Sequence, residues 1–223
     1  MEFAKFTGKT LDEALACDIV TLHVPLIKDG EYKTLHLIDE QKLLKLKPNA
    51  IFINASRGNV VDNEALSEFL EKRPDVKVWL DVFEGEPEIN CKKLLSQVDG
   101  ATAHIAGYSY ESKRRANVML ANTLAHVLKL EDPKAYQMPK PEIESTSLGK
   151  VENLDLDLIR RLVFSVYDVR RDSLMFKNCF KDAKSFDAMR SNYRERRELS
   201  SLHLLNVEDK FKEQLSLLGF SVD

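Results

Sequence analysis

The chain has 223 residues and a formal net charge of −3, with 43% hydrophobic and 31% charged residues. Such a composition is typical of a soluble globular protein with room for one large domain or two small ones. The near-neutral charge argues against a general attraction to nucleic acid, and no window approaches the roughly eighteen continuous apolar residues of a membrane span.

The first 130 residues alternate between short apolar runs and amphipathic segments. Nearly continuous apolar runs predict strands buried on both faces, here at residues 18–24, 50–56, 76–82 and 101–106. Between them, Asp39 is expected to cap a helix that reaches Lys47, and Asp62 to cap a second one. This alternation predicts an α/β fold, the second half of a doubly wound parallel (Rossmann-like) sheet.

A last long helix is predicted from residue 111 to residue 130. Its apolar side chains recur at helical spacing, so that one stripe carries Ala116, Leu120, Leu124 and Val127. We expect this stripe to pack against another part of the protein.

The composition changes after this helix. Residues 133–149 hold Pro133, Pro139 and Pro141, which predicts an extended linker between domain 1–132 and domain 150–223. The second domain is expected to be a small α+β unit, with helices at 157–171 and 208–218, a helical stretch to about 198, and strands at 201–207 and 220–222. Its arginine-rich "MRSNYRERRE" is interrupted by acidic residues, which favours a solvated or interface face over a nucleic-acid patch.

The cysteines predict neither disulfides nor a metal site. Cys17, Cys91 and Cys179 are isolated and lack metal-ligand spacing, and "MEFAKFTGKT" lacks the apolar core of a signal peptide. A reducing, cytoplasmic location is the expectation.

Polar residues follow the predicted strands. Arg57, Asp81 and His104 each come at or just after the end of an apolar run, and Glu86 lies just past Asp81. The carboxyl ends of parallel strands meet at one edge, so we expect these side chains to converge around a crevice. An arginine that can clamp a carboxylate, a histidine that can move a proton and a carboxylate that can hold it charged suit a hydroxy-acid substrate.

Each member has a structural reading when taken alone. Arg57 resembles a surface ion-pair partner, Asp81 a helix cap and Glu86 a turn residue. The other histidines are expected to play structural parts, and these are His23, His36, His126 and His203. The combination at successive strand ends is more specific than any one residue.

Three segments carry a family resemblance: "INASRGNVVDNEAL", "LDVFEGEPE" and "ATAHIAGYS" resemble signatures of the D-isomer-specific 2-hydroxyacid dehydrogenases. The resemblance covers essentially the whole chain, and "VYDVRRDS" and "NYRERRELSSL" narrow it to the members that oxidise 4-phospho-D-erythronate with NAD in pyridoxal phosphate biosynthesis. It implies that residues 150–223 form a dimerisation domain, so that the partner is a second copy.

The resemblance also implies a role for each site residue. Arg57 would bind the substrate carboxylate, Glu86 would orient the ring of His104, and His104 would act as general base. Tyr108 and Arg57 would contact the substrate. The implied NAD-binding residues are Val24, Ala55, Ser56, Arg57, Asp81 and Gly107.

One departure concerns the dinucleotide phosphate turn. The chain has eight glycines, and no two lie closer than Gly100 and Gly107, so no G-x-G-x-x-G is present. We therefore expect the chain to be the C-terminal portion of the enzyme and to be inactive alone. Two alternatives stay open, another D-2-hydroxyacid dehydrogenase and a non-catalytic chain that only dimerises.

Overall fold

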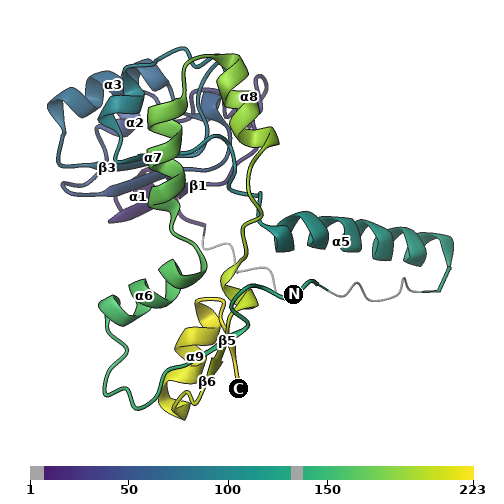
Figure 1. Ribbon diagram of the computed structural model, residues 1–223. Coiled ribbons are helices and arrows are strands. Elements are labelled where there is room, and N and C mark those ends of the chain that lie inside the picture. Colours follow the sequence, from purple (N-terminus) through teal and green to yellow (C-terminus); the bar gives the residue numbers. More distant parts are fainter. Residues whose placement is uncertain (1–7, 132–137) are drawn as a thin grey trace. The chain divides into compact units, whose positions relative to one another are not determined.

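The computed structural model describes residues 8–131 and 138–223 (Figure 1). The chain divides into two compact units, residues 1–106 with 170–192, and residues 107–169 with 193–223. Residues 132–137, which include the start of the predicted linker, lie outside the described residues. None of the helices in the described ranges is long and apolar enough to cross a lipid bilayer.

A four-stranded parallel sheet forms the centre of the first unit. Its strands lie in chain order, β1 (Ile19–Leu22), β2 (Ile51–Asn54), β3 (Lys77–Leu80) and β4 (Gly100–Ala101). The register places Leu22 opposite Asn54 and Asn54 opposite Leu80, so the first three strands end in one row. The predicted α/β class and the parallel sheet are confirmed.

Two helices of the first unit, α2 and α3, begin where their predicted caps place them. The Asp39 side chain accepts the Lys42 N–H, and the Asp62 side chain accepts the Ala65 N–H, so both predicted caps are confirmed. The helices are α1 (Leu11–Leu15), α2 (Glu40–Leu43), the 3₁₀ turn η1 (Gly58–Val60), α3 (Asn63–Lys72), α4 (Leu94–Gln97), α7 (Val169–Cys179) and α8 (Ala183–Ser191). The sequence reading did not include α1 and α4, and it extended α2 too far, to Lys47.

The prediction that the strands are buried on both faces is wrong for β1, β2 and β3. Burial alternates along them, and Ile19 and Ile51 are 61% and 37% exposed. Ile19, Ile51 and Lys77 lie opposite one another on neighbouring strands. Because the strands follow one another without a reversal of order, right-handed crossovers place their helices on one face and leave the other open.

The strand predicted at residues 101–106 is also much shorter in the structure. β4 ends at Ala101, and the backbone N–H groups of Ile105 and Ala106 point to the carboxylate of Asp81 instead of to a neighbouring strand. A side-chain acceptor has replaced the ladder partner, which a reading of apolar runs does not anticipate.

Helices α7 and α8 pack in the first unit, although the sequence placed them in the tail. Phe176 is 2% exposed, and its ring centroid lies 5.8 Å from Phe83 and 5.9 Å from Phe186. The hydroxyl of Ser173 accepts the Ala101 N–H at 3.0 Å, so α7 satisfies a backbone group on the free edge of β4. The single helix predicted at 157–171 is interrupted after Val166, and α7 begins at Val169.

The second unit contains a three-stranded parallel sheet, in which β6 (His203–Leu205) pairs with β5 (Ser145–Ser147) and with β7 (Ser221–Val222). Its core is built from the buried residues Leu162, Leu202, Leu204, Val207, Leu215 and Phe220. The helices are α5 (Tyr110–Leu128), α6 (Leu156–Val166), the 3₁₀ turn η2 (Leu199–Ser201) and α9 (Asp209–Leu217). The two strands predicted in the tail are confirmed as β6 and β7.

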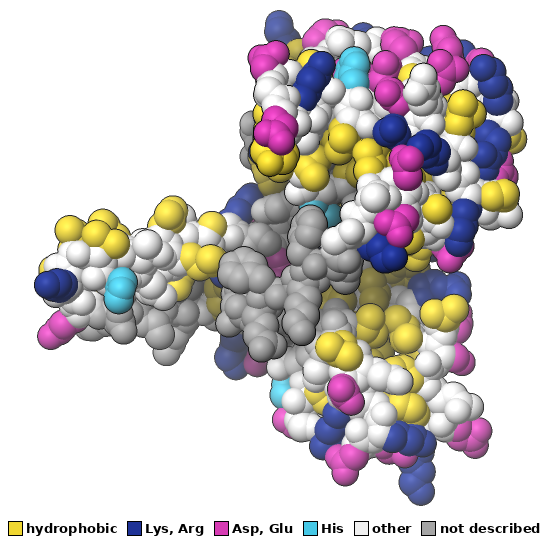
Figure 2. Space-filling model, turned by 180° about the vertical axis from the view of Figure 1, so that it is seen from behind, with side chains coloured by type: hydrophobic (Ala, Val, Ile, Leu, Met, Phe, Trp, Pro, Cys, Tyr) yellow, Lys and Arg dark blue, Asp and Glu magenta, His cyan; other side chains and the backbone are white. Residues whose placement is uncertain are grey.

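The predicted apolar stripe of α5 is exposed. Leu120, Leu124 and Val127 are 70%, 57% and 68% accessible, and hydrophobic side chains line the helix in Figure 2. Ser109 caps its start by accepting the Ser112 N–H.

The packing of α7 gives a stability prediction. Phe176→Ala should lower the free energy of unfolding of the first unit by about 3–5 kcal/mol, because a buried ring is lost and a cavity is left. The only tryptophan, Trp79, lies in β3, so its fluorescence during urea unfolding reports on this unit. Leu174→Ala, at a residue of the same helix that is 65% exposed, is the matched control. An unshifted Trp79 transition in Phe176→Ala would show that α7 does not belong to this core.

Candidate functional site

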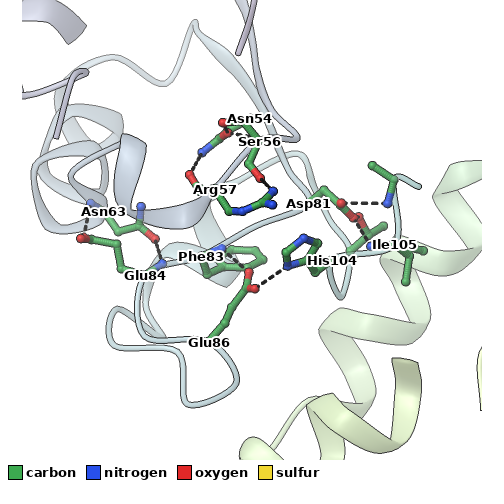
Figure 3. Close-up of polar contacts among 12 residues, drawn as sticks. Asn54, Ser56, Arg57, Asn63, Asp81, Phe83, Glu84, Glu86, His104 and Ile105 are labelled. Atoms are coloured by element: carbon green, nitrogen blue, oxygen red, sulfur yellow. Dashed lines mark hydrogen bonds and ion pairs between the residues drawn. The ribbon is translucent and has the colours of Figure 1, made fainter. Parts of the chain in front are cut away.

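Three loops follow the row of strand ends in the first unit, and each carries one of the predicted catalytic residues. Arg57 follows β2, Glu86 follows β3 and His104 follows β4. In Figure 3 the guanidinium end of Arg57 and the imidazole of His104 are directed toward one another, and the carboxylate of Glu86 lies on the other side of the ring. The structure therefore brings these three residues together as the sequence predicts.

His104 and Glu86 form a close pair. Nδ1 of His104 lies 2.8 Å from Oε2 of Glu86, and the second carboxylate oxygen accepts the Phe83 N–H at 2.5 Å. An ionised carboxylate only accepts hydrogen bonds, so Nδ1 is the donor and Nε2 is left with its lone pair. Such an imidazole can take a proton at Nε2, and the carboxylate then stabilises the imidazolium.

His104 adopts a backbone conformation that favours glycine, with φ at 54°. A non-glycine residue stays there only when the surrounding structure holds it. Asp81 stabilises this conformation, because its backbone carbonyl accepts the His104 N–H at 2.7 Å.

The carboxylate of Asp81 shapes the rest of the His104 loop. It accepts hydrogen bonds from the Thr102 hydroxyl at 2.5 Å and from the N–H groups of Ile105 and Ala106, each at 2.8 Å. Asp81 is only 8% exposed, and this burial raises the pKa of its carboxyl group although the three donors act in the opposite direction. Asp81 is thus an internal anchor and not the helix cap of the structural reading.

Asn54 organises the turn that carries Arg57. Its side chain is fully buried, and its amide donates to the Arg57 carbonyl at 3.0 Å while its oxygen accepts the N–H and the hydroxyl of Ser56. The Arg57 guanidinium donates to the Ser56 carbonyl at 2.7 Å, and the side chain is otherwise exposed. The charged guanidinium therefore avoids the cost of burial, because the turn places it outside the core although it follows an apolar strand.

Gly58 allows two of the three loops to approach closely. A Cβ atom at this position would lie 1.9 Å from the carbonyl oxygen of Phe83. The Arg57 turn and the Glu86 loop are therefore in direct backbone contact, and no other residue type fits at position 58.

The predicted NAD-binding residues fall into two groups. Val24 and Ala55 are half-buried and Ser56 is buried, and all three follow strand ends of the first unit. Gly107 and Tyr108 belong to the second unit, where Tyr108 meets Tyr193 edge-on with ring centroids 6.0 Å apart. Their predicted contacts with cofactor and substrate stay predictions.

Asn54 was missed by the sequence reading, as were Asn63 and Glu84, which bond to each other. The Glu84 N–H donates to the Asn63 side chain, and the Asn63 N–H donates back to the Glu84 carboxylate, both at 3.0 Å. A polar residue at the last position of the apolar run "IFIN" was the available signal for Asn54. Of the histidines read as structural, His36 lies 2.6 Å from Glu84.

Among the residues that the structure describes, no group of three or more histidine, cysteine, aspartate or glutamate side chains could hold a metal ion.

Comparison with known proteins matches the two parts of the chain to two families. Residues 1–106 match the D-isomer specific 2-hydroxyacid dehydrogenase, NAD binding domain, and residues 137–219 match a domain of unknown function, DUF3410. The curated erythronate-4-phosphate dehydrogenase of Escherichia fergusonii is 44% identical over 216 residues, which are 96% of this chain and 56% of that protein. The enzyme of that name from Shewanella oneidensis is 42% identical over 92% of this chain and 54% of its own length. The chain thus spans about half the length of the curated relatives it matches.

Among solved structures, D-lactate dehydrogenase from Aquifex aeolicus, complexed with NAD and lactic acid, is 29% identical. The alignment covers 54% of this chain and 40% of that one, with a TM-score of 0.44.

The burial of Asp81 predicts its titration. An acid whose folded pKa is raised stays protonated while the unfolded chain has already ionised, so its contribution to stability is lost as pH rises from about 4 through the raised pKa. Carboxyl ¹³C spectra should show Asp81 titrating at higher pH than Asp75, whose pKa is lowered by its hydrogen bonds with Arg73. A midpoint of Asp81 at or below that of Asp75 would contradict the burial of this carboxylate.

Proposed function

We propose, from the premise that residues 1–106 belong to the NAD-binding domain family of the D-isomer-specific 2-hydroxyacid dehydrogenases, that this chain carries the catalytic residues of such an enzyme. The observation that supports the proposal most is the pairing of His104 with Glu86 beside Arg57. In this pair Glu86 keeps the ring proton of His104 on Nδ1, so that Nε2 can act as a base. Arg57 supplies a binding site for a carboxylate.

The proposed substrate is 4-phospho-D-erythronate, oxidised at C2 to the 2-oxo acid on the route to pyridoxal phosphate. Its support is the similarity of this chain to curated proteins named erythronate-4-phosphate dehydrogenase. This chain spans 56% and 54% of the length of two of these relatives, so the activity is proposed for the whole protein.

The proposed cofactor is NAD, which when bound would supply the acceptor for the C2 hydride. Half-buried Val24 and Ala55 fit the nicotinamide end, since they present small or apolar groups at the carboxyl edge of the sheet, and buried Ser56 supports the same turn. The 223 residues contain no G-x-G-x-x-G for the pyrophosphate. Asp81, implied by resemblance to bond the carboxamide, already accepts three hydrogen bonds, so its main proposed role is to hold the loop of His104.

In this mechanism Arg57 binds the substrate carboxylate and polarises the C2 oxygen. His104 takes the C2 hydroxyl proton at Nε2, a contribution on the order of a hundred- to ten-thousandfold. Glu86 keeps the proton of the neutral ring on Nδ1 and stabilises the imidazolium that forms.

The same proposal includes a homodimer and a cytoplasmic location. Leu156 and Leu217 of the second unit are 79% and 81% exposed, and we propose them as apolar contacts of the dimer interface. Val166, on helix α6, is only partly buried and packs against the core of that unit. The three cysteines are free, as a reducing compartment requires.

Substitutions of Glu86 and Arg57 in the full-length protein test the chemistry. Glu86→Gln should lower kcat more than it raises KM, because Glu86 stabilises a charge that exists only after proton transfer. Arg57→Lys should also be costly, since an ammonium cannot make the planar fork that matches a carboxylate. Steady-state rates across pH and a panel of 2-hydroxy acids measure both effects and the substrate preference. An unchanged pH profile in Glu86→Gln would count against the pairing, and near-normal constants in Arg57→Lys would remove that residue from the substrate site.

The dimer is tested at an exposed apolar position. Leu217→Glu should weaken the dimer at least tenfold, because a carboxylate in an apolar interface loses its hydration. Glu213→Gln, an exposed polar position on the same helix, is the control. Sedimentation velocity that shows the same dimer affinity for Leu217→Glu and the unmodified protein would exclude this face.

A further inference from the structure

Glu84 lies beside the predicted catalytic residues and has no role in the mechanism above. It precedes Glu86 by two residues, and its side chain is 12% exposed. A carboxylate so far removed from water requires partners. Its partners come from two other loops of the first unit.

The carboxylate of Glu84 accepts three hydrogen bonds. Oε1 accepts from Nε2 of His36 at 2.6 Å and from the side-chain amide of Asn59 at 3.2 Å, and Oε2 accepts from the Asn63 N–H at 3.0 Å. His36 follows β1, whereas Asn59 and Asn63 follow β2. One side chain therefore ties together the loops that follow three neighbouring strands.

The bonded segments make further polar contacts of their own. The His36 N–H donates to the Asn59 carbonyl at 2.8 Å, and Nδ1 of His36 lies 3.7 Å from the carboxylate of Asp62, the cap of α3. On the other side, the Asn90 N–H donates to the Glu84 carbonyl and closes the loop that contains Glu86. A displacement at Glu84 would therefore be passed to both loops.

The position of this cluster relative to the chemistry is the basis of the inference. Asn59 is two residues after Arg57, and Glu84 is two residues before Glu86. We propose that Glu84 is a positioning residue, an inference that rests on the proposed function. Its carboxylate fixes the spacing between the Arg57 loop and the Glu86 loop and so places Glu86 against His104.

Glu84→Gln tests this with little change of shape. An amide has one accepting oxygen and one donating nitrogen, so it cannot accept from all three donors. In the complete gene product kcat should fall about ten- to a hundredfold, since misplacement of a reacting group by about 1 Å has effects of that order. The matched control is Asp75→Asn, which removes a carboxylate that also bridges two segments through Arg73 and the Asn49 N–H.

The double variant Glu84→Gln with Asn59→Asp separates positioning from general damage. The carboxylate of residue 59 can accept from the amide of residue 84, so the hydrogen bond between these two side chains is restored with donor and acceptor exchanged. The double variant should recover at least half of the logarithmic loss in kcat, whereas Asn59→Asp alone places two carboxylates together and should be impaired.

Amide hydrogen exchange gives a readout that does not require turnover. The Phe83 N–H donates to Glu86 and not to Glu84, so its exchange reports whether Glu86 has moved. Glu84→Gln should accelerate exchange at Phe83 at least tenfold relative to Asp75→Asn, and the double variant should reverse the effect. Unaltered exchange at Phe83 would overturn the positioning role whatever the activity. Absence of dehydrogenase activity in the unmodified protein, with Phe83 exchange behaving as expected, would instead refute the proposed function alone.

Discussion

The hydrogen bonds that converge on the buried carboxylate of Asp81 are the constraint on which the site depends. The end of β3 supplies this acceptor, and the loop after β4 folds around it through Thr102, Ile105 and Ala106. The carbonyl of the same residue fixes His104, which has a positive φ. Without these hydrogen bonds nothing would hold the backbone after Ala101 away from the sheet, and the imidazole of His104 would not lie against Glu86.

The other two loops are held by the same physical means. Asn54 satisfies the Ser56–Arg57 turn from inside the core, and Glu84 ties the loops that carry Arg57 and Glu86. Gly58 removes the steric barrier between those loops. The loops that carry Arg57, Glu86 and His104 thus depend on largely buried polar groups whose hydrogen bonds are satisfied, which is how a site on loops becomes precise.

The sequence predicted the sheet, the two aspartate caps and the convergence of Arg57, Glu86 and His104, because each follows from a local pattern combined with the rule for parallel strand ends. It failed where a distant contact overrides a local pattern. Residues 102–106 are apolar enough for a strand, yet a side chain 21 or more residues earlier captures their backbone. The helices α7 and α8 read as part of the tail by sequence position, and only the burial of Phe176 and Phe186 shows that they complete the first core. Asn54 and Glu84 carry no periodicity, so their roles become visible only with the loops in place.

The account depends on which nitrogen of His104 carries the proton in the neutral ring. Nitrogen NMR of the protein labelled with ¹⁵N-histidine, with the His104 signals assigned by His104→Gln, measures this directly. The account predicts a hydrogen on Nδ1, bonded to Glu86, and an unprotonated Nε2 that is ready to accept a proton. A neutral ring protonated at Nε2 would contradict it, since in that tautomer Nε2 has no lone pair with which to accept a proton.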